Sequence, residues 1–425
     1  MASVAEAAAR VTPAITPGSL IELRKLSITS DDGSFMVGDL ARGEFIEVPE
    51  IAVIVIEALR DGSTIAEAAR LAHAHAGAEV DVAGFVADLR DVGFVTSIDG
   101  IAIASGGQEL TDGGRAGAVA ARLARPLYSL PAMVIYGLLF AGCVVALTAV
   151  PWLRPGYGQL FFVSNPVLSI ALLNVVTMPL LILHEVAHWL GARAEGIPAR
   201  ITLTRRYYFM VAQTDLTGLW ALPPRRRLAP LLAGLAFETV TTVVLLGGLA
   251  AAHLGWWHPL PTVSRLIAAL VLVQVFSISF QFALFMRTDL YAVLITCLGC
   301  RNLSRVSRLT MKGWYRRRTA AEEAELAAAD QRDKAVARWY GWVQAGGAAL
   351  VAFYFAVFFA PATVYLIRWI VTGLATSSPV GSRFWIVLLS GAVAMFPLLV
   401  PPVSYLRDRR RRTASLTSRG GVAGR

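Results

Sequence analysis

The sequence predicts a mainly α-helical membrane protein, a polytopic bundle of about six spans that carries a small α+β, winged-helix-like domain at its N-terminus. The 425 residues are 56% hydrophobic, with a mean hydropathy of +0.58, which exceeds the apolar share of ordinary soluble domains. The apolar residues gather in runs of about 20, the length that crosses a bilayer. The first hundred residues instead combine short β-prone runs with apolar residues at helical spacing.

The N-terminal domain is expected at 20–105, after a flexible segment at 1–19. Two β-prone runs, at 20–28 and 35–48, precede three amphipathic helical patterns that begin near residues 49, 63 and 81. Thr64 and Glu67 form a capping-box pattern at the start of the second helix. Asp99-Gly100 is a turn signal between two closing strands. A polar linker is expected at 106–126.

Six apolar runs within a domain at 127–406 are expected to cross the membrane. They lie at 127–150, 166–190, 228–254, 264–286, 341–371 and 381–406. Residues 287–300 form a shorter apolar piece, which is expected to be re-entrant or interfacial. The arginine-rich tail at 407–425 is expected to be disordered.

The net charge of +10 is distributed unevenly over the loops. The connections 191–227 and 287–338 are rich in arginine, whereas 151–165 has only Arg154 and the segments 255–264 and 373–382 have no Lys or Arg. By the positive-inside rule, both termini and the two basic connections lie in the cytoplasm. We expect an integral protein of a bacterial plasma membrane, with its basic groups on anionic lipids and with no nucleic-acid partner.

The motif that carries chemistry is His184-Glu185-Val186-Ala187-His188, inside the second apolar run. On a helix, histidines four apart share a face and can bind one zinc ion, while the adjacent glutamate can take a proton from water held there. Ionisable groups are costly inside a bilayer, which favours a functional interpretation. Pro179 precedes the motif by five residues and is expected to kink the span, which could admit water.

A catalytic zinc site normally has three protein ligands, so a third is required. Asp289, at the cytoplasmic end of the fourth span, and Glu238, about 15 Å into the third, can both reach the depth of the histidines. Glu195 is set aside, since the nearby zinc-protease pattern needs histidine where this chain has Ala194.

These residues resemble the site-2 protease family of intramembrane zinc metalloproteases, in particular its branch of peptide zinc metalloproteases. The resemblance covers 127 to about 310 and rests on HEVAH and on the segment Thr288-Asp289-Leu290-Tyr291. It implies that one zinc ion is bound by His184, His188 and Asp289, with Glu185 as the base. Leu290 stands where the family usually has glycine, which puts the local backbone turn in doubt. Glu238 replaces a polar family residue and is expected to support a ligand or to contact substrate.

The N-terminal domain is similar to PqqD-like domains of peptide-modification systems. The similarity rests on the Thr-Ile-x-Glu start at Thr64 and on the Gly93-Phe94-Val95 finish. It implies binding of a cytoplasmic peptide along a strand edge and an adjacent helix. The expected function is therefore zinc-dependent hydrolysis of a membrane-associated or small peptide near the cytoplasmic leaflet. The alternatives are a non-catalytic receptor or export component that recruits a peptide, and a transporter whose polar path includes Glu238 and Asn174.

Three further patterns bear on these alternatives. Residues 201–223 alternate branched, aromatic and polar side chains and predict a hairpin at the membrane edge, either a strand edge for substrate or an interfacial anchor. Cys297 and Cys300 form a CxxC without a second pair, which favours two small apolar residues at a helix end over a metal site. His73 and His75 point to different helix faces and are expected at the surface.

Overall fold

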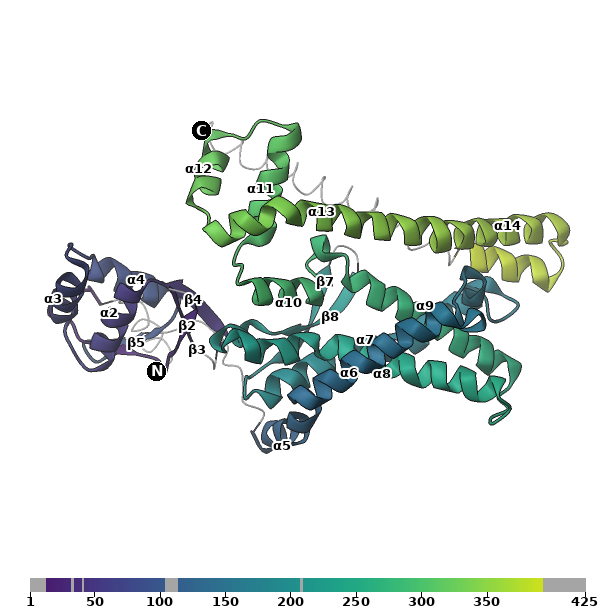
Figure 1. The fold of residues 1–425 in the computed structure, drawn as a ribbon, viewed down its shortest axis with the longest axis horizontal. Helices are drawn as coiled ribbons and strands as arrows, with labels where there is room; N and C mark the ends of the chain where they lie inside the picture. Colours follow the sequence, from purple (N-terminus) through teal and green to yellow (C-terminus); the bar gives the residue numbers. More distant parts are fainter. Residues whose placement is uncertain (1–12, 32–33, 40–41, 104–113, 207–208, 393–425) are drawn as a thin grey trace, which may run out of the picture.

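The computed structural model describes residues 13–31, 34–39, 42–103, 114–206 and 209–392. The chain is mainly helical, with a small strand-containing region at the N-terminal end and one hairpin within the helical part (Figure 1). The predicted tail at 407–425 and residues 1–12 of the predicted N-terminal segment lie outside the described residues.

The N-terminal region contains two antiparallel sheets and three helices. One sheet has the order β2 (Ser27–Asp31), β3 (Ser34–Asp39), β4 (Glu44–Val48), and the other has the order β1 (Ile21–Leu23), β5 (Val95–Ile98), β6 (Ile101–Ala102). Between β4 and β5 the chain forms α2 (Glu50–Arg60), α3 (Ile65–Ala76) and α4 (Val82–Asp91). The predicted order of short strands, three helices and closing strands is therefore found.

Local sequence signals determine where these elements begin and end. Thr64 caps α3, since its side chain accepts from the Glu67 amide while the Glu67 carboxylate accepts from the Thr64 amide. Asp99 and Gly100 both have positive φ, 54° and 76°, in the two-residue turn between β5 and β6, as a tight hairpin requires. Apolar side chains from both sheets and all three helices form one core, in which Val37, Ile56 and Phe94 are fully buried.

Among the described residues, five helical stretches are long and apolar enough to cross a membrane, by length and composition. They are α6 (Leu130–Ala149), α7 (Pro166–Ala194), α8 (Pro224–His253), α9 (Pro261–Gln281) and the continuous stretch from α13 (Gln331–Tyr354) through a π-helical segment (Phe355–Phe359) to α14 (Ala360–Thr376). Only the start of the predicted sixth span is described, as the helix Ser382–Ala392; residues 393–406 lie outside the described residues.

Two boundaries differ from the prediction. The second half of the segment expected to be a linker, 106–126, contains the helix α5 (Gly114–Ala124), which packs against α7. Its alanines favour a helix. The fourth span, expected to reach 286, ends at Gln281, where the chain turns through η5 (Leu284–Met286) into α10 (Asp289–Leu298).

The segments that connect the spanning helices form the rest of the described structure. The predicted hairpin is present as β7 (Arg200–Arg206) and β8 (Phe209–Asp215), followed by the short helix η4 (Thr217–Ala221). After α10 come α11 (Leu303–Tyr315) and α12 (Ala320–Ala328). The sheet β2-β3-β4 contacts η4, so the N-terminal region lies beside the same end of the helices as the hairpin and α10 (Figure 1).

Candidate metal centre

His184 and His188 lie one turn apart on α7 and face the same way. Both are buried, at 6% and 2% exposure, and their Nε2 atoms are 3.2 Å apart. Helix α7 continues unbroken for 29 residues with Pro179 inside it. The four-residue spacing that the motif supplies therefore brings two ring nitrogens to one point on the helix surface.

Asp289 reaches these histidines because the chain reverses after α9. Arg287 adopts a left-handed conformation (φ 57°) at the end of η5, and α10 then begins at Asp289. Gln281, the last residue of α9, donates from Nε2 to Oδ2 of Asp289 and accepts from the Asp289 amide, both at 3.2 Å. The turn is thus made at Arg287, and Leu290 lies in the helix, where glycine is not required.

The three ligand atoms form an equilateral triangle. Oδ2 of Asp289 lies 3.2 Å from Nε2 of His184 and 3.2 Å from Nε2 of His188, which matches the separation between the two nitrogens. Ligand atoms at about 2.0–2.1 Å from a tetrahedral zinc ion are about 3.3–3.4 Å apart. The group His184, His188 and Asp289 could therefore hold one metal ion with a fourth position free.

Contacts on the outer side of each imidazole determine which nitrogen faces the triangle. Nδ1 of His188 lies 2.9 Å from the carbonyl oxygen of Pro230, and Nδ1 of His184 lies 3.2 Å from Oε1 of Glu238. The Pro230 carbonyl can only accept, so Nδ1 of His188 carries its proton and its Nε2 presents a lone pair. Nδ1 of His184 makes no hydrogen bond among the described residues, but the Glu238 carboxylate beside it favours a proton there and a lone pair on Nε2. Two lone pairs and a carboxylate oxygen then converge, and a cation is the partner that satisfies all three.

Glu238 lies on the side of His184 away from the triangle. It is buried within α8, and its Oε1 accepts a hydrogen bond of 2.5 Å from the hydroxyl of Ser277 on α9. The carboxylate thus links α8 and α9 behind the imidazole. If His184 binds a metal ion, a carboxylate placed in this way could orient its imidazole.

Gly234 lets α8 approach the two imidazoles. A Cβ atom at this position would stand 2.4 Å from Nε2 of His184 and 2.5 Å from Nε2 of His188. A second close approach lies one turn away along both helices, where Gly191 of α7 faces Pro230 of α8. A Cβ atom at position 191 would be 2.9 Å from the Cα of Pro230. Small residues at both crossing points bring the backbones of α7 and α8 close together around the site.

Glu185 is held by the hairpin. Its Oε2 accepts hydrogen bonds from the amide and from the hydroxyl of Thr214 on β8, at 2.7 Å and 2.8 Å. The same hydroxyl lies 2.8 Å from the backbone carbonyl of Glu185. Thr214 is buried, at 6% exposure, so the end of β8 holds the Glu185 carboxylate in place.

Other predicted candidates lie elsewhere. Asn174 is ten residues before His184 on α7, about 15 Å along the axis, and its exposed amide donates to the carbonyl of Ile170. The structure therefore does not bring Asn174 to the site. Glu195 ends α7 and forms an ion pair with Arg226 at 2.6 Å.

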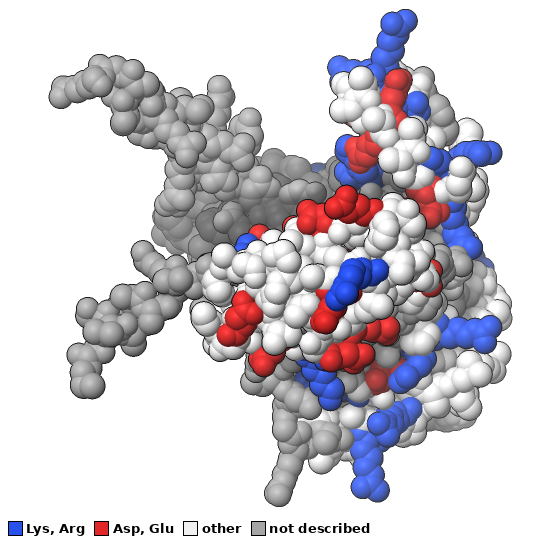
Figure 2. Space-filling view, turned by 90° about the vertical axis from the view of Figure 1, so that its left-hand side faces the viewer, with Lys and Arg blue, Asp and Glu red and all other residues white. Residues whose placement is uncertain are grey.

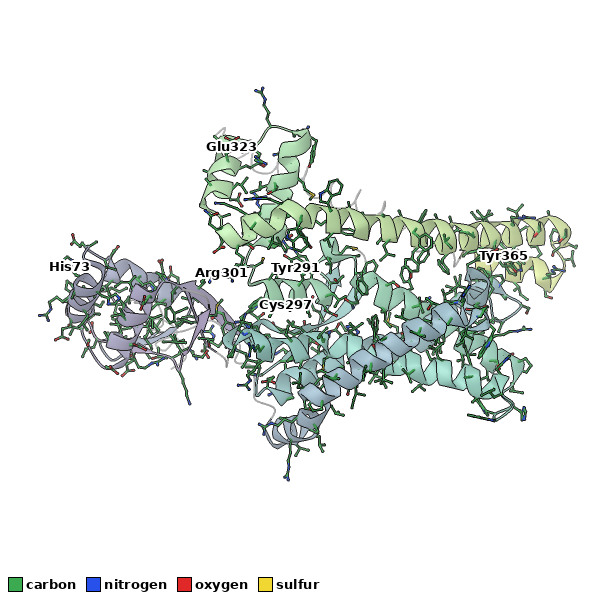
Figure 3. All side chains as sticks on the ribbon, in the orientation of Figure 1. His73, Tyr291, Cys297, Arg301, Glu323 and Tyr365 are labelled. Atoms are coloured by element: carbon green, nitrogen blue, oxygen red, sulfur yellow. The ribbon has the colours of Figure 1, made fainter. Side chains whose placement is uncertain are left out.

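The cysteines and N-terminal histidines are also separate from the triangle. Cys297 is exposed in the last turn of α10 and Cys300 is buried just beyond it, both as free thiols. Burial raises the pKa of the Cys300 thiol to about 12, so this thiol stays protonated. His73 and His75 are exposed on α3 at the far end of the N-terminal region, as the sequence predicts (Figure 3).

Five contributing residues were not predicted: Thr214, Pro230, Gly234, Ser277 and Gln281. Three of them had a weak signal in the sequence. Gln281 and Ser277 are polar residues in an apolar span, and Gly234 lies one turn before Glu238. Pro230 acts through its backbone carbonyl, and Thr214 through a contact between a strand and a helix. Neither contact is encoded in a local pattern.

Comparison of the chain with family models, with curated proteins and with solved structures finds no match.

Proposed function

We propose that this chain is an intramembrane zinc-dependent endopeptidase that hydrolyses a peptide bond of a membrane-associated or small peptide substrate. The observation that carries the proposal is the triangle of His184, His188 and Asp289, with 3.2 Å between each pair of ligand atoms and with Glu185 beside it on the same helix. The similarity of these residues to the site-2 protease family supports the same assignment.

Each residue has a distinct role in this mechanism. A zinc ion held by the triangle would supply Lewis-acid chemistry, polarising the scissile carbonyl and lowering the pKa of water there to about 7. Glu185 accepts the proton of the attacking water and returns it to the leaving amine. Glu238 and the Pro230 carbonyl keep the two imidazoles oriented. Thr214 keeps the Glu185 carboxylate in place.

The hairpin suits an extended substrate. A peptide bond within a helix is shielded by its own hydrogen bonds, whereas a strand added to a sheet edge exposes one bond at a time. Strands β7 and β8 form a two-stranded sheet whose last residues contact Glu185. We therefore assign the hairpin to substrate binding rather than to interfacial anchoring alone.

The proposal also includes topology and the N-terminal region. We assign this end of the bundle to the cytoplasm, against anionic lipids of a bacterial plasma membrane, because the connections 191–227 and 287–338 are basic and the positive-inside rule favours that orientation. The N-terminal region is assigned as a PqqD-like, winged-helix-like domain that recruits a peptide. On the face shown in Figure 2, acidic side chains outnumber basic ones over this region, which disfavours the phosphate backbone of a nucleic acid and leaves a peptide as the partner.

The test is the variant Glu185→Gln in the full chain, reconstituted in lipid nanodiscs. Zinc content by mass spectrometry should match the wild type, and hydrolysis of a positional-scanning library of quenched fluorescent decapeptides should vanish. His184→Ala should lose both zinc and hydrolysis.

A second candidate is a non-catalytic receptor that recruits a peptide, with the metal in a structural role. The observation in its favour is that Thr214 already occupies the Glu185 carboxylate with two hydrogen bonds. If the zinc-loaded wild type binds peptides from the library yet cleaves none of them, the receptor is correct and the endopeptidase is wrong.

A further inference from the structure

The N-terminal region packs one face of its sheet β2-β3-β4 against the helical part. The hydroxyl of Thr29 on β2 donates to the carbonyl of Ala221 at the end of η4, at 2.5 Å. The carboxylate of Glu47 on β4 pairs with the guanidinium of Arg301 in the loop between α10 and α11. Figure 3 shows Arg301 where the N-terminal region meets the helices. Two polar contacts thus hold the two parts together.

Between these contacts lies a cavity of about 700 Å³, well within the range of roughly 300–1,000 Å³ that ligand sites occupy. One wall is the outer face of the sheet, where Met36 and Glu47 are register partners and Phe45 lies across Gly38. The opposite wall comes from η4, the start of α8, the end of α10 and the start of α13. Its residues are Thr217, Trp220, Pro224, Arg227, Ile295, Thr296, Gly299, Cys300, Arg301, Asp330, Gln331 and Arg332.

Two helices lead from this cavity to the candidate metal centre. Ile295 follows Asp289 by six residues on α10, about 9 Å along the axis, and Arg227 precedes Gly234 by seven residues on α8, about 10 Å. An extended chain advances about 3.3 Å per residue. A peptide that leaves the cavity therefore needs only about three residues to reach the metal centre.

The lining has the chemistry of a peptide site. Met36, Phe45, Trp220 and Ile295 offer apolar contacts, while the charged lining residues are three arginines, Arg227, Arg301 and Arg332, and two acids, Glu47 and Asp330. Three positive and two negative groups leave a net charge of one positive. A lipid phosphate in the cavity would be repelled by the two carboxylates. A peptide presents both hydrogen-bond donors and acceptors, and an acidic side chain on it would complement the excess positive charge.

We propose that this cavity binds an extended, weakly acidic peptide segment between the N-terminal region and the metal centre. The site uses the outer face of the sheet rather than a strand edge, and it is distinct from the zinc-binding residues. That the bound segment continues to Glu185 rests on the proposed function, whereas binding in the cavity does not.

The experiment places a benzophenone amino acid at Met36 in the full-length Glu185→Gln chain. The chain is held in nanodiscs of phosphatidylcholine and phosphatidylglycerol and irradiated with a biotinylated random decapeptide library. A second label at Gln331 probes the opposite wall. The control label is at Leu71, which is half exposed on α3 and does not line the cavity. Mass spectrometry identifies each adduct as peptide or phospholipid.

We expect peptide adducts several-fold more abundant at positions 36 and 331 than at 71, with acidic residues enriched in the captured sequences. Equal labelling at all three positions, phospholipid adducts alone, or no adducts at 36 and 331 would each overturn the proposal. Because the readout is binding to an inactive variant, it stands if wild-type hydrolysis fails. If the wild type cleaves peptides but neither wall is labelled, only the cavity proposal is wrong.

Discussion

Gly234 and His184 are in closer contact than any side chain at position 234 would allow. A Cβ at 234 would lie 2.4 Å from both Nε2 and Cε1 of the imidazole. Because the contact is made with the nitrogen that faces Asp289, the glycine determines whether the metal-binding group can assemble.

Gly234→Ala is therefore expected to lose zinc while the helix survives. Alanine favours a helix over glycine by about 1 kcal/mol, but its methyl group displaces His184 from the triangle. Zinc affinity, measured by competition with a fluorescent chelator, should fall by at least about 10–100-fold, the loss typical when support of a ligand is removed.

Gly247→Ala, on the same helix, is the matched control, since a Cβ there meets no atom within 4 Å. Its zinc affinity should equal that of the wild type. Equal zinc binding by Gly234→Ala and Gly247→Ala would show that the imidazoles are not held as described.

Replacement of Glu238 should weaken zinc binding without removing a ligand. In Glu238→Leu the Ser277 hydroxyl loses its acceptor and Nδ1 of His184 loses the carboxylate that lies 3.2 Å away, and we expect zinc affinity to fall about 10–100-fold. Glu238→Gln keeps an acceptor oxygen and should lose much less. Isothermal titration in detergent distinguishes the two variants.

Thr241→Val serves as the control for Glu238, because the Thr241 hydroxyl bonds only to the carbonyl of Phe237 in its own helix. If Glu238→Leu abolishes zinc binding as completely as His184→Ala, Glu238 is itself a ligand and its supporting role is wrong.

Thr214→Val tests how the base is positioned. Valine keeps the shape but removes the hydroxyl that donates to Glu185, a charge-assisted bond of about 1.5–3 kcal/mol. If that bond acts in the transition state, kcat should fall roughly 10–100-fold while KM and zinc content stay unchanged. Steady-state kinetics on the best library peptide measures kcat and KM separately.

Thr214→Ser restores the hydroxyl and should recover most of kcat. A rise in KM with unchanged kcat would assign Thr214 to substrate binding instead. Loss of zinc in Thr214→Val would indicate that the hairpin supports the fold of the site as a whole.

Cys300 should resist alkylation in the folded chain. Its thiol is buried and its pKa is raised to about 12 by that burial, so the reactive thiolate is absent at pH 8 and appears only as the pH approaches 12. N-ethylmaleimide at pH 8 should leave Cys300 unmodified by peptide mass spectrometry, and modify it after unfolding in dodecyl sulfate. Rapid labelling of native Cys300 would contradict the burial of this thiol.

The spans and two ligands were predictable because single segments encode them. Histidines four apart meet on any helix, and Thr64 and Asp99-Gly100 act within a few residues of themselves. Asp289 could be proposed from its residue type and its place at a span end. Its position beside the histidines depends on the left-handed conformation of Arg287 and on the two hydrogen bonds with Gln281. No local sequence pattern specifies these two features.

The contacts that complete the site are tertiary and largely made by the backbone. Backbone carbonyls and amides occur at almost every residue, so the residue types do not indicate that the Pro230 carbonyl and the Thr214 amide take part in the site. Helix α5 was not predicted, because its short alanine-rich sequence follows a polar segment and was assigned to the linker; it packs against α7.

The segment from Thr214 to Ala221 connects the candidate metal centre to the N-terminal region. At one end it holds the carboxylate of Glu185, and at the other its carbonyl accepts from Thr29 of the N-terminal sheet, seven residues later. The N-terminal sheet and the Glu185 carboxylate are therefore bonded to opposite ends of the same eight-residue segment, which is the shortest covalent connection between them among these contacts.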